Sequence, residues 1–214
     1  MMKKTLIFDF DGTIADTHLF LVEIYNSYAQ EFNCEKIDTD DLDSYKDKNA
    51  VQIIKKLHVP IMKIPVMIAR AKKHFHEHME KVHPFEGIAQ ALRNLKDAGH
   101  RIGILSSNSK ENIHKFLGAH DLEIFDFIHS TNRVLSKHFA IKKLIGQLNC
   151  SHKDVLYIGD EIRDIEAAKN LEITMIAVSW GYNLRRALEA YQPDHVIDAP
   201  EELQELLKSL EESS

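Results

Sequence analysis

Residues 6–13 read Leu-Ile-Phe-Asp-Phe-Asp-Gly-Thr, an apolar run that leads directly into two aspartates and a glycine. The run at 5–8 predicts a short buried strand that ends where the carboxylates begin. In extended backbone, residues i and i+2 point to the same side, so we expect Asp9 and Asp11 to converge on one point beyond the strand. Two carboxylates this close need a cation between them, or one takes up a proton because its pKa rises. Both arrangements are typical of catalysis rather than of a stabilising contact.

Strand-like runs recur along the chain and alternate with segments of helical periodicity. The runs lie at 5–8, 101–105, 125–129, 155–158, 174–178 and, more weakly, 195–197. Helical patterns lie at about 88–98, where Gly99 is a typical helix C-cap, and at 110–117, 137–148, 162–170 and 201–210. This alternation predicts an α/β fold in which a parallel sheet is flanked by helices. In such sheets, ligands bind beyond the carboxyl ends of the strands.

One long stretch, 16–82, departs from this alternation. It contains no convincing strand, only helical patterns at about 19–32, 40–45, 50–57 and 63–81. Prolines at 60 and 65 lie in its later part, and Pro84 follows it, as expected where helices begin or end. The sequence therefore predicts an all-helical subdomain at 16–82, inserted into a core formed by 1–15 and 83–214.

Composition narrows the function classes. The chain has 214 residues, of which 44% are hydrophobic and 28% charged, and 27 Lys and Arg face 33 Asp and Glu. A net charge of -6 argues against a nucleic-acid partner, which would need a basic face. No apolar run suits a signal peptide or a membrane span, and two cysteines in a chain of this length fit a reducing compartment. We expect a cytoplasmic protein with no membrane partner, either a monomer or a homodimer.

Polar side chains follow two further strand-like runs. Small donors come after 102–105, at Ser106, Ser107 and Asn108, and lead into a helix whose positive end attracts anions. Acidic residues come after 155–158, at Asp160, Glu161 and Asp164. Together with Asp9 and Asp11 they form an all-oxygen set, and a few carboxylates with waters and a substrate phosphate are what Mg²⁺ prefers. The sequence predicts a metal site that is open to phosphate.

Four motifs in order resemble those of the haloacid dehalogenase superfamily. They are Asp-x-Asp-Gly-Thr at 9–13, a serine after the second strand, a lysine at the start of a later helix, and Gly-Asp-x-x-x-Asp at 159–164. The helical insertion after the first motif and Trp-Gly-Tyr at 180–182 are similar to the phosphoglycolate phosphatase and β-phosphoglucomutase branch. The resemblance implies a Rossmann-like sheet, a cap over the site, Mg²⁺ dependence and phosphoryl transfer through an aspartyl-phosphate.

The resemblance also implies roles for the reacting groups. Asp9 matches the nucleophile, and carboxylates do form acyl-phosphates when a cation suppresses their repulsion from phosphate. Asp11 matches the general acid that protonates the leaving oxygen and then activates water, while its backbone carbonyl is a metal ligand. Lys137 matches the lysine that offsets the charge of the nucleophile and the phosphoryl oxygens.

The remaining roles are those of binding residues. Ser106 matches the phosphate-binding hydroxyl, with Ser107 and Asn108 as neighbours whose amides assist it. Gly12 and Thr13 are further candidates for substrate or phosphate binding. Asp160 matches the acidic metal ligand, and Asp164 matches a ligand that acts directly or through water. Glu161 is a candidate for the same role.

Single motifs have simpler explanations. Asp-x-Asp-Gly also occurs in turns at strand ends, and Gly159-Asp160 also occurs where a turn leads into a helix N-cap. Lys137 has Lys142 and Lys143 as neighbours, and helix lysines usually face solvent. His74 and His78 have the spacing of a zinc-binding helix, but no His-Glu-x-x-His motif or cysteine accompanies them, which favours a solvated face. The joint occurrence of four ordered motifs favours the catalytic interpretation.

The predicted protein is thus a Mg²⁺-dependent phosphatase of a small phosphorylated metabolite, resembling phosphoglycolate or a sugar phosphate. A phosphomutase of the β-phosphoglucomutase type stays open, because the motifs are shared. A dehalogenase is disfavoured, because the dehalogenases of this superfamily lack the second aspartate. A non-catalytic binding or regulatory protein on the same fold is the alternative of another class, although no motif residue is lost here.

Overall fold

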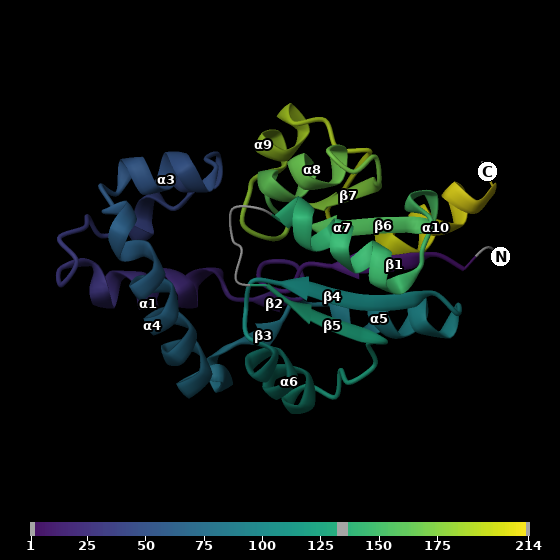
Figure 1. The fold of residues 1–214 in the computed structure, drawn as a ribbon, viewed down its shortest axis with the longest axis horizontal. Coiled ribbons are helices and arrows are strands. Elements are labelled where there is room, and N and C mark those ends of the chain that lie inside the picture. The colour runs from purple at the N-terminus through teal and green to yellow at the C-terminus, as the bar shows by residue number, and fades with distance from the viewer. Residues whose placement is uncertain (1–2, 132–136, 213–214) are drawn as a thin grey trace.

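The computed structural model describes residues 3–131 and 137–212. Its core is a six-stranded sheet with strand order β5-β4-β1-β6-β7-β8 (Figure 1). Every pair of neighbouring strands is parallel. The strands are β1 Thr5–Phe8, β4 Arg101–Ser106, β5 Phe127–Ser130, β6 Val155–Gly159, β7 Thr174–Val178 and β8 His195–Ile197. The predicted α/β fold with a Rossmann-like parallel sheet is confirmed.

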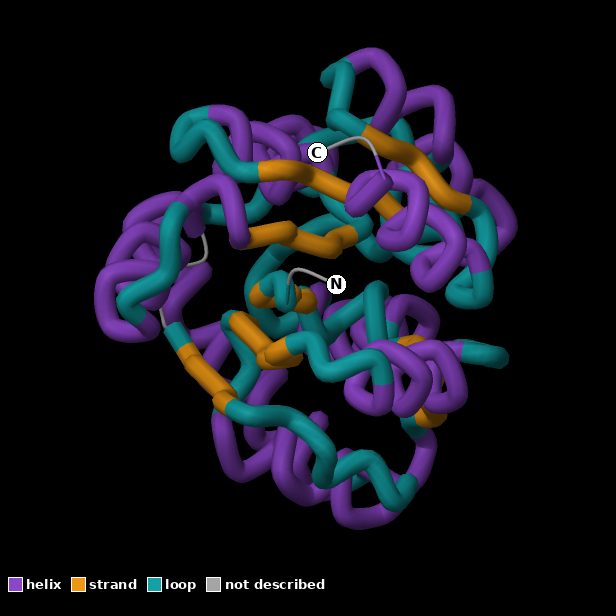
Figure 2. Tube along the Cα trace, turned by 90° about the vertical axis from the view of Figure 1, so that its right-hand side faces the viewer, coloured by secondary structure: helices purple, strands orange, loops and turns teal. Residues whose placement is uncertain are grey.

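Helices cover both faces of this sheet, as Figure 2 shows from the end opposite to the helical insertion. They are α5 Ile88–Asp97, α6 Lys110–Ala119, α7 Lys137–Leu148, α8 Ile162–Lys169, α9 Arg185–Ala190 and α10 Glu202–Glu212. Alternate residues of β1 pack into two different hydrophobic clusters, one on each face of the sheet. Leu6 and Phe8 pack in the cluster that includes α5, α6 and α10, whereas Ile7 packs in the cluster of α7, α8 and α9. Because both faces are covered, all four residues of β1 are buried.

A second, two-stranded antiparallel sheet joins the insertion to the core. It pairs β2 Ala15–Asp16 with β3 His83–Pro84. The expectation of no strand from residue 16 onward was wrong at Asp16, because a strand of two residues is too short to give an alternating pattern. The chain thus leaves and re-enters the core side by side.

Residues 17–82 lie between these two strands and form helices, 3₁₀ turns and loops. We call this segment the helical insertion. Its helices are α1 His18–Ala29, α2 Asp43–Lys46, α3 Ala50–Lys56 and α4 Ile64–Glu77, with 3₁₀ turns at Thr39–Asp41, Ile61–Lys63 and Met79–Lys81. The predicted helix at 63–81 is therefore shorter, because His78 leaves the helical conformation at φ −124° and ψ 31°. In Figure 1, α1, α3 and α4 stand at one end of the sheet, and both termini lie at the other.

Two elements of the core differ from the sequence-based expectation. Strand β5 starts two residues later than predicted, since the carboxylate of Asp126 accepts a hydrogen bond from the backbone N of Ile102 at 2.9 Å. Helix α9 was not predicted, because six residues are too few to show helical periodicity. Within the described ranges, no helix has the length and apolarity that a membrane crossing requires.

Candidate active site

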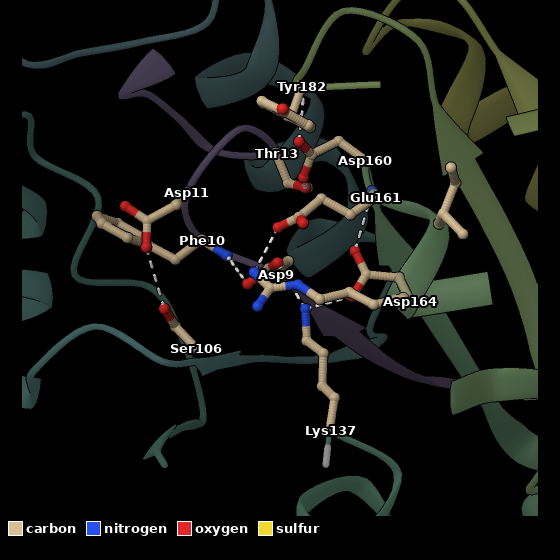
Figure 3. A network of polar contacts seen from close by, with 12 residues as sticks. Asp9, Phe10, Asp11, Thr13, Ser106, Lys137, Asp160, Glu161, Asp164 and Tyr182 are labelled. Atoms are coloured by element: carbon tan, nitrogen blue, oxygen red, sulfur yellow. Dashed lines mark hydrogen bonds and ion pairs between the residues drawn. The ribbon is translucent and has the colours of Figure 1, made fainter. Parts of the chain in front are cut away.

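Three adjacent strands end at one edge of the sheet and carry the predicted polar residues there. Strand β1 lies between β4 and β6. Asp9 follows β1, Ser106 is the last residue of β4, and Asp160 follows β6. Since the strands are parallel, their carboxyl ends share this edge, and the side chains meet beyond it (Figure 3).

Asp9, Asp160 and Asp164 form a buried carboxylate cluster. Oxygen atoms of the three side chains lie within 4.8 Å of one another. Burial, followed by the charges of nearby carboxylates, raises the pKa of Asp160 well above its usual range. Burial also raises the pKa of Asp164 to about 6, although Lys137 opposes the shift. Three buried oxygen donors with this excess of negative charge suit a divalent cation such as Mg²⁺.

Lys137, at the start of α7, contacts two carboxylates of this cluster. Its Nζ lies 2.6 Å from Oδ2 of Asp9 and also donates a hydrogen bond to Oδ1 of Asp164. Burial by itself would lower the pKa of Lys137, but the Asp164 and Asp9 carboxylates outweigh it and hold the pKa well above its usual value. The side chain is only 7% exposed, so it is not a solvated helix lysine.

The side chain of Asp11 lies apart from this cluster. Figure 3 shows it turned toward Ser106 and away from Asp160. Its carboxylate accepts hydrogen bonds from Asn108 Nδ2 at 3.2 Å and from Ser106 Oγ at 3.4 Å. The expected convergence of both carboxylates was wrong, because the backbone turns immediately after Phe10, whose carbonyl accepts from the amide nitrogens of 13–15. Burial and the charge of Asp9 raise the pKa of Asp11 to about 7.

Gly12 and Thr13 contact the carboxylate of Asp160. The hydroxyl of Thr13 donates to Oδ1 at 2.8 Å, and the backbone N of Tyr182 donates to Oδ2 at 2.7 Å. Gly12 has a φ of 79°, and a Cβ placed on it would lie 2.1 Å from Oδ2. In this structure, Thr13 therefore holds a potential metal ligand in place, and the absence of a side chain at Gly12 leaves room for that ligand.

Gly12→Ala is expected to destabilise the protein by about 1–3 kcal/mol or more, because it combines a left-handed backbone with a clash against Asp160. Gly118→Ala is the matched control, since a Cβ there meets nothing within 4 Å. Placed in α6, that change should be neutral or stabilise by up to about 1 kcal/mol. Urea unfolding of both variants measures the difference. Equal stability of Gly12→Ala and the unchanged protein would contradict this account of the turn.

The residues after β4 form a polar turn that reaches Asp11. Ser106 is fully buried, and its Oγ accepts from the backbone N of Asn108 at 2.9 Å. The carbonyl of Asn108 accepts from Ser130 Oγ at 2.5 Å, which ties the turn to β5. Ser107 is half-buried and lines a cavity beside Asp11. The turn thus presents hydroxyl and amide groups at the same edge as the carboxylates.

Glu161 lies beside the cluster and is paired with a cation. Its Oε1 accepts from Nη2 of Arg163, while its backbone N donates to Oδ2 of Asp164 at 3.1 Å. Arg163 was not predicted as a site residue, because an arginine on the first turn of a helix normally faces solvent. Its place between Asp160 and Asp164 in the last motif was the available signal.

A loop of the core binds the insertion directly. Asn183 Nδ2 donates to the carbonyl of Lys46 at 2.6 Å, and its Oδ1 accepts from the backbone N of Ile162 at 2.9 Å. The hydroxyl of Tyr182 donates to the carbonyl of Tyr45 at 3.3 Å. The Trp-Gly-Tyr segment pointed to this loop, but not to Asn183. These bonds hold the helical insertion against the sheet edge that carries the carboxylates.

The histidines of the insertion have other partners. The rings of His74 and His78 stack with centroids 4.4 Å apart, and Nδ1 of His74 lies 3.3 Å from the hydroxyl of Tyr28. Across the part of the chain that the structure describes, Asp9, Asp160 and Asp164 form the only group of three or more His, Cys, Asp or Glu side chains that lie close enough together to hold a metal ion.

Comparisons with known proteins agree on one family. The profile of the haloacid dehalogenase-like hydrolases matches residues 6–178. A phosphoglycolate phosphatase from Synechococcus elongatus is 31% identical over 208 residues, covering 97% of this chain and 98% of that protein. Pyrophosphatase PpaX from Bacillus mycoides is 25% identical over 215 residues, covering 98% of this chain and 99% of its own. A solved structure of a predicted phosphatase from Clostridium acetobutylicum has a TM-score of 0.83 at 21% identity, covering 97% and 100% of the two chains.

Proposed function

The chain belongs to the haloacid dehalogenase-like hydrolase family, and on that premise we propose that it is a Mg²⁺-dependent phosphatase of a small phosphomonoester. One observation carries the proposal. Asp9 lies in a buried cluster with Lys137 and two further carboxylates, whereas Asp11 is held separately by Ser106 and Asn108. Two carboxylates in different surroundings can take different roles in one reaction.

The proposed first step is attack on phosphorus by a carboxylate oxygen of Asp9. A phosphoanhydride bond forms on Asp9, and the bond from phosphorus to the substrate oxygen breaks. Lys137, 2.6 Å from Asp9, places a positive charge beside that carboxylate and offsets charge on the phosphoryl oxygens. Ser106 and the amides after it bind the same oxygens.

Asp11 carries the proton in both half-reactions. In its protonated form it donates to the departing alcohol oxygen, and as the resulting carboxylate it accepts a proton from the water that hydrolyses the aspartyl-phosphate. A pKa near 7 allows both forms at neutral pH. Inorganic phosphate and the alcohol leave, and Asp9 is restored.

Mg²⁺ would be held by Asp9, Asp160 and Asp164, with Glu161 beside them as a further acidic group. When bound, it supplies positive charge that reduces the repulsion between the nucleophile and the phosphate. Thr13 and the backbone of Tyr182 orient Asp160 for this role. Positioning of a ligand by such contacts is typical of metal sites.

We assign the helical insertion as the cap of this site. Asn183 and Tyr182 hold its 45–48 segment against the core, and the β2–β3 pair provides its two connections. Residues of α1, α3 and α4 then face the carboxylates and would contact the part of the substrate that is not phosphate. The names of the relatives suggest phosphoglycolate and pyrophosphate as first substrates to test.

Removal of divalent metal is expected to abolish turnover. Protein treated with EDTA should release no phosphate from p-nitrophenyl phosphate, phosphoglycolate or pyrophosphate, and added Mg²⁺ should restore the activity to at least one of them. Mg²⁺ should also raise the melting temperature, because it binds the folded state only. Full turnover in EDTA would contradict the proposal.

The products of the same assay separate the alternatives. Free phosphate in equal amount to the alcohol supports a phosphatase. Transfer of the phosphoryl group to a second hydroxyl of one sugar would instead identify a phosphomutase. Binding of phosphate esters without turnover, in protein that holds Mg²⁺, would identify a non-catalytic protein on this fold.

A further inference from the structure

A large cavity inside the helical insertion opens onto the candidate active site. Its volume is about 370 Å³, within the range of small-molecule pockets, about 300–1,000 Å³. Asp11, Gly12, Asp160 and Glu161 line it at one end. A group attached to a phosphate at the carboxylate cluster would therefore extend into this cavity.

Aliphatic side chains form most of the rest of its wall. They come from three helices, as Leu21 and Val22 of α1, Ile53 and Ile54 of α3, and Met67 and Ile68 of α4. Most of them are only half-buried, and Leu21 is 37% exposed. Apolar surface left open to water at a concave site is typical of ligand binding.

The wall of this cavity has no counter-charge for a second anionic group. Among its lining residues in the described part of the chain, there is no lysine or arginine. His18 is the only lining residue with a basic side chain, and burial together with Lys46 lowers its pKa, which favours the neutral imidazole. A carboxylate or a second phosphate buried there would lose its hydration without an ionic partner.

A neighbouring smaller cavity has basic, hydroxyl and amide side chains beside its apolar ones. Its volume is about 210 Å³, and its lining includes Lys72, Arg163, Ser107 and Asn108. Asp11, Leu21 and Ile68 line both cavities, so the two meet beside the proposed proton donor. The polar side suits an anionic phosphoryl group, and the aliphatic side suits an uncharged, apolar body.

From this division we infer that the substrate is a phosphomonoester of an alcohol with an extended apolar chain, and not a small substrate with a second anionic group, such as phosphoglycolate or pyrophosphate. The inference rests on the proposed phosphatase function and specifies its substrate class. The phosphoryl group is transferred to Asp9 and then to water, and the apolar alcohol is released from the insertion.

A homologous series of alkyl phosphates tests this inference. With Mg²⁺ present, kcat/KM should rise from ethyl to butyl, hexyl and octyl phosphate by about fourfold for each methylene that enters the cavity. Each member should also exceed phosphoglycolate and pyrophosphate once the chain reaches the aliphatic wall. A flat series, or a preference for phosphoglycolate or pyrophosphate, would overturn the inference.

Two variants on helix α3 form a matched pair for this test. Ile54→Gln places an amide in the cavity and should lower kcat/KM for octyl phosphate by about tenfold, with little effect on ethyl phosphate. Val51→Gln is the control, because Val51 is 52% exposed and is not among the residues that line the cavity. Equal losses for ethyl and octyl phosphate in Ile54→Gln would overturn the inference, because the long chain would then gain nothing specific from this part of the wall.

Binding separates failure of this inference from failure of the proposed function. If no ester is hydrolysed, the phosphatase proposal fails. Calorimetry with ethyl and octyl phosphonate still measures how strongly an apolar chain binds in the cavity. Tighter binding of octyl phosphonate, weakened by Ile54→Gln but not by Val51→Gln, supports the apolar substrate site. Equal affinity for both phosphonates would overturn it.

Discussion

Asp9→Asn is expected to lower kcat for phosphate release by about 10⁴-fold or more, because a carboxamide has no anionic oxygen to attack phosphorus. The variant should stay folded. Lys137 keeps its contact with Asp164, and the buried cluster loses one negative charge. We expect the free energy of unfolding to change by no more than about 1–2 kcal/mol. Steady-state kinetics with Mg²⁺ and urea unfolding measure the two effects.

Asp97→Asn is the matched control for that change. Asp97 is exposed at the end of α5, so its replacement removes the same charge away from the site. It should retain full turnover. Asp9→Asn protein with normal stability and undiminished turnover would exclude Asp9 as the nucleophile.

Lys137→Met is expected to have the largest effect on stability. It removes the buried ion-pair partner that Asp9 and Asp164 share. Loss of one partner of a buried ion pair costs about 3–5 kcal/mol, and we expect a loss of this size in metal-free protein. Because the same carboxylates are proposed metal ligands, saturating Mg²⁺ should restore part of the lost stability. Thermal unfolding in EDTA measures the loss of stability, and thermal unfolding with Mg²⁺ measures the part that is restored.

Lys142→Met is the control on the same helix. Lys142 is exposed on α7, and exposed charges contribute at most about 1 kcal/mol. Its replacement should leave stability and turnover nearly unchanged. If Lys137→Met were as stable as Lys142→Met in EDTA, the buried network around Asp9 would not exist in solution.

Local sequence patterns predicted the core of this protein well. The apolar run at 5–8 became β1, and the alternation of strands with helices became a parallel sheet covered on both faces. These features depend on short-range periodicity and on burial of both sheet faces, which one sequence records directly. The resemblance to the haloacid dehalogenase superfamily, drawn from four ordered motifs, is confirmed by the family profile.

Features that depend on few residues or on distant contacts were not visible in the sequence. The β2–β3 pair consists of two residues on each side, separated by the whole insertion. The direction of Asp11 was wrong, because the i, i+2 rule holds only in extended backbone, and the chain turns after Phe10. Hydrogen bonds from Asn108 and Ser106, about a hundred residues away, then hold the carboxylate.

The sequence by itself determined which polar groups reach the active edge, because a residue that follows a parallel strand must lie at that strand's carboxyl end. Only the tertiary structure decided how those groups are divided, with Asp9 beside Lys137 and Asp11 beside Asn108. It also decided the apolar character of the cavity above them. That cavity is formed by helices α1, α3 and α4, whose side chains each follow an ordinary helical pattern. Whether such side chains fill a core or line an open pocket depends on the spacing of the helices, which no local pattern encodes.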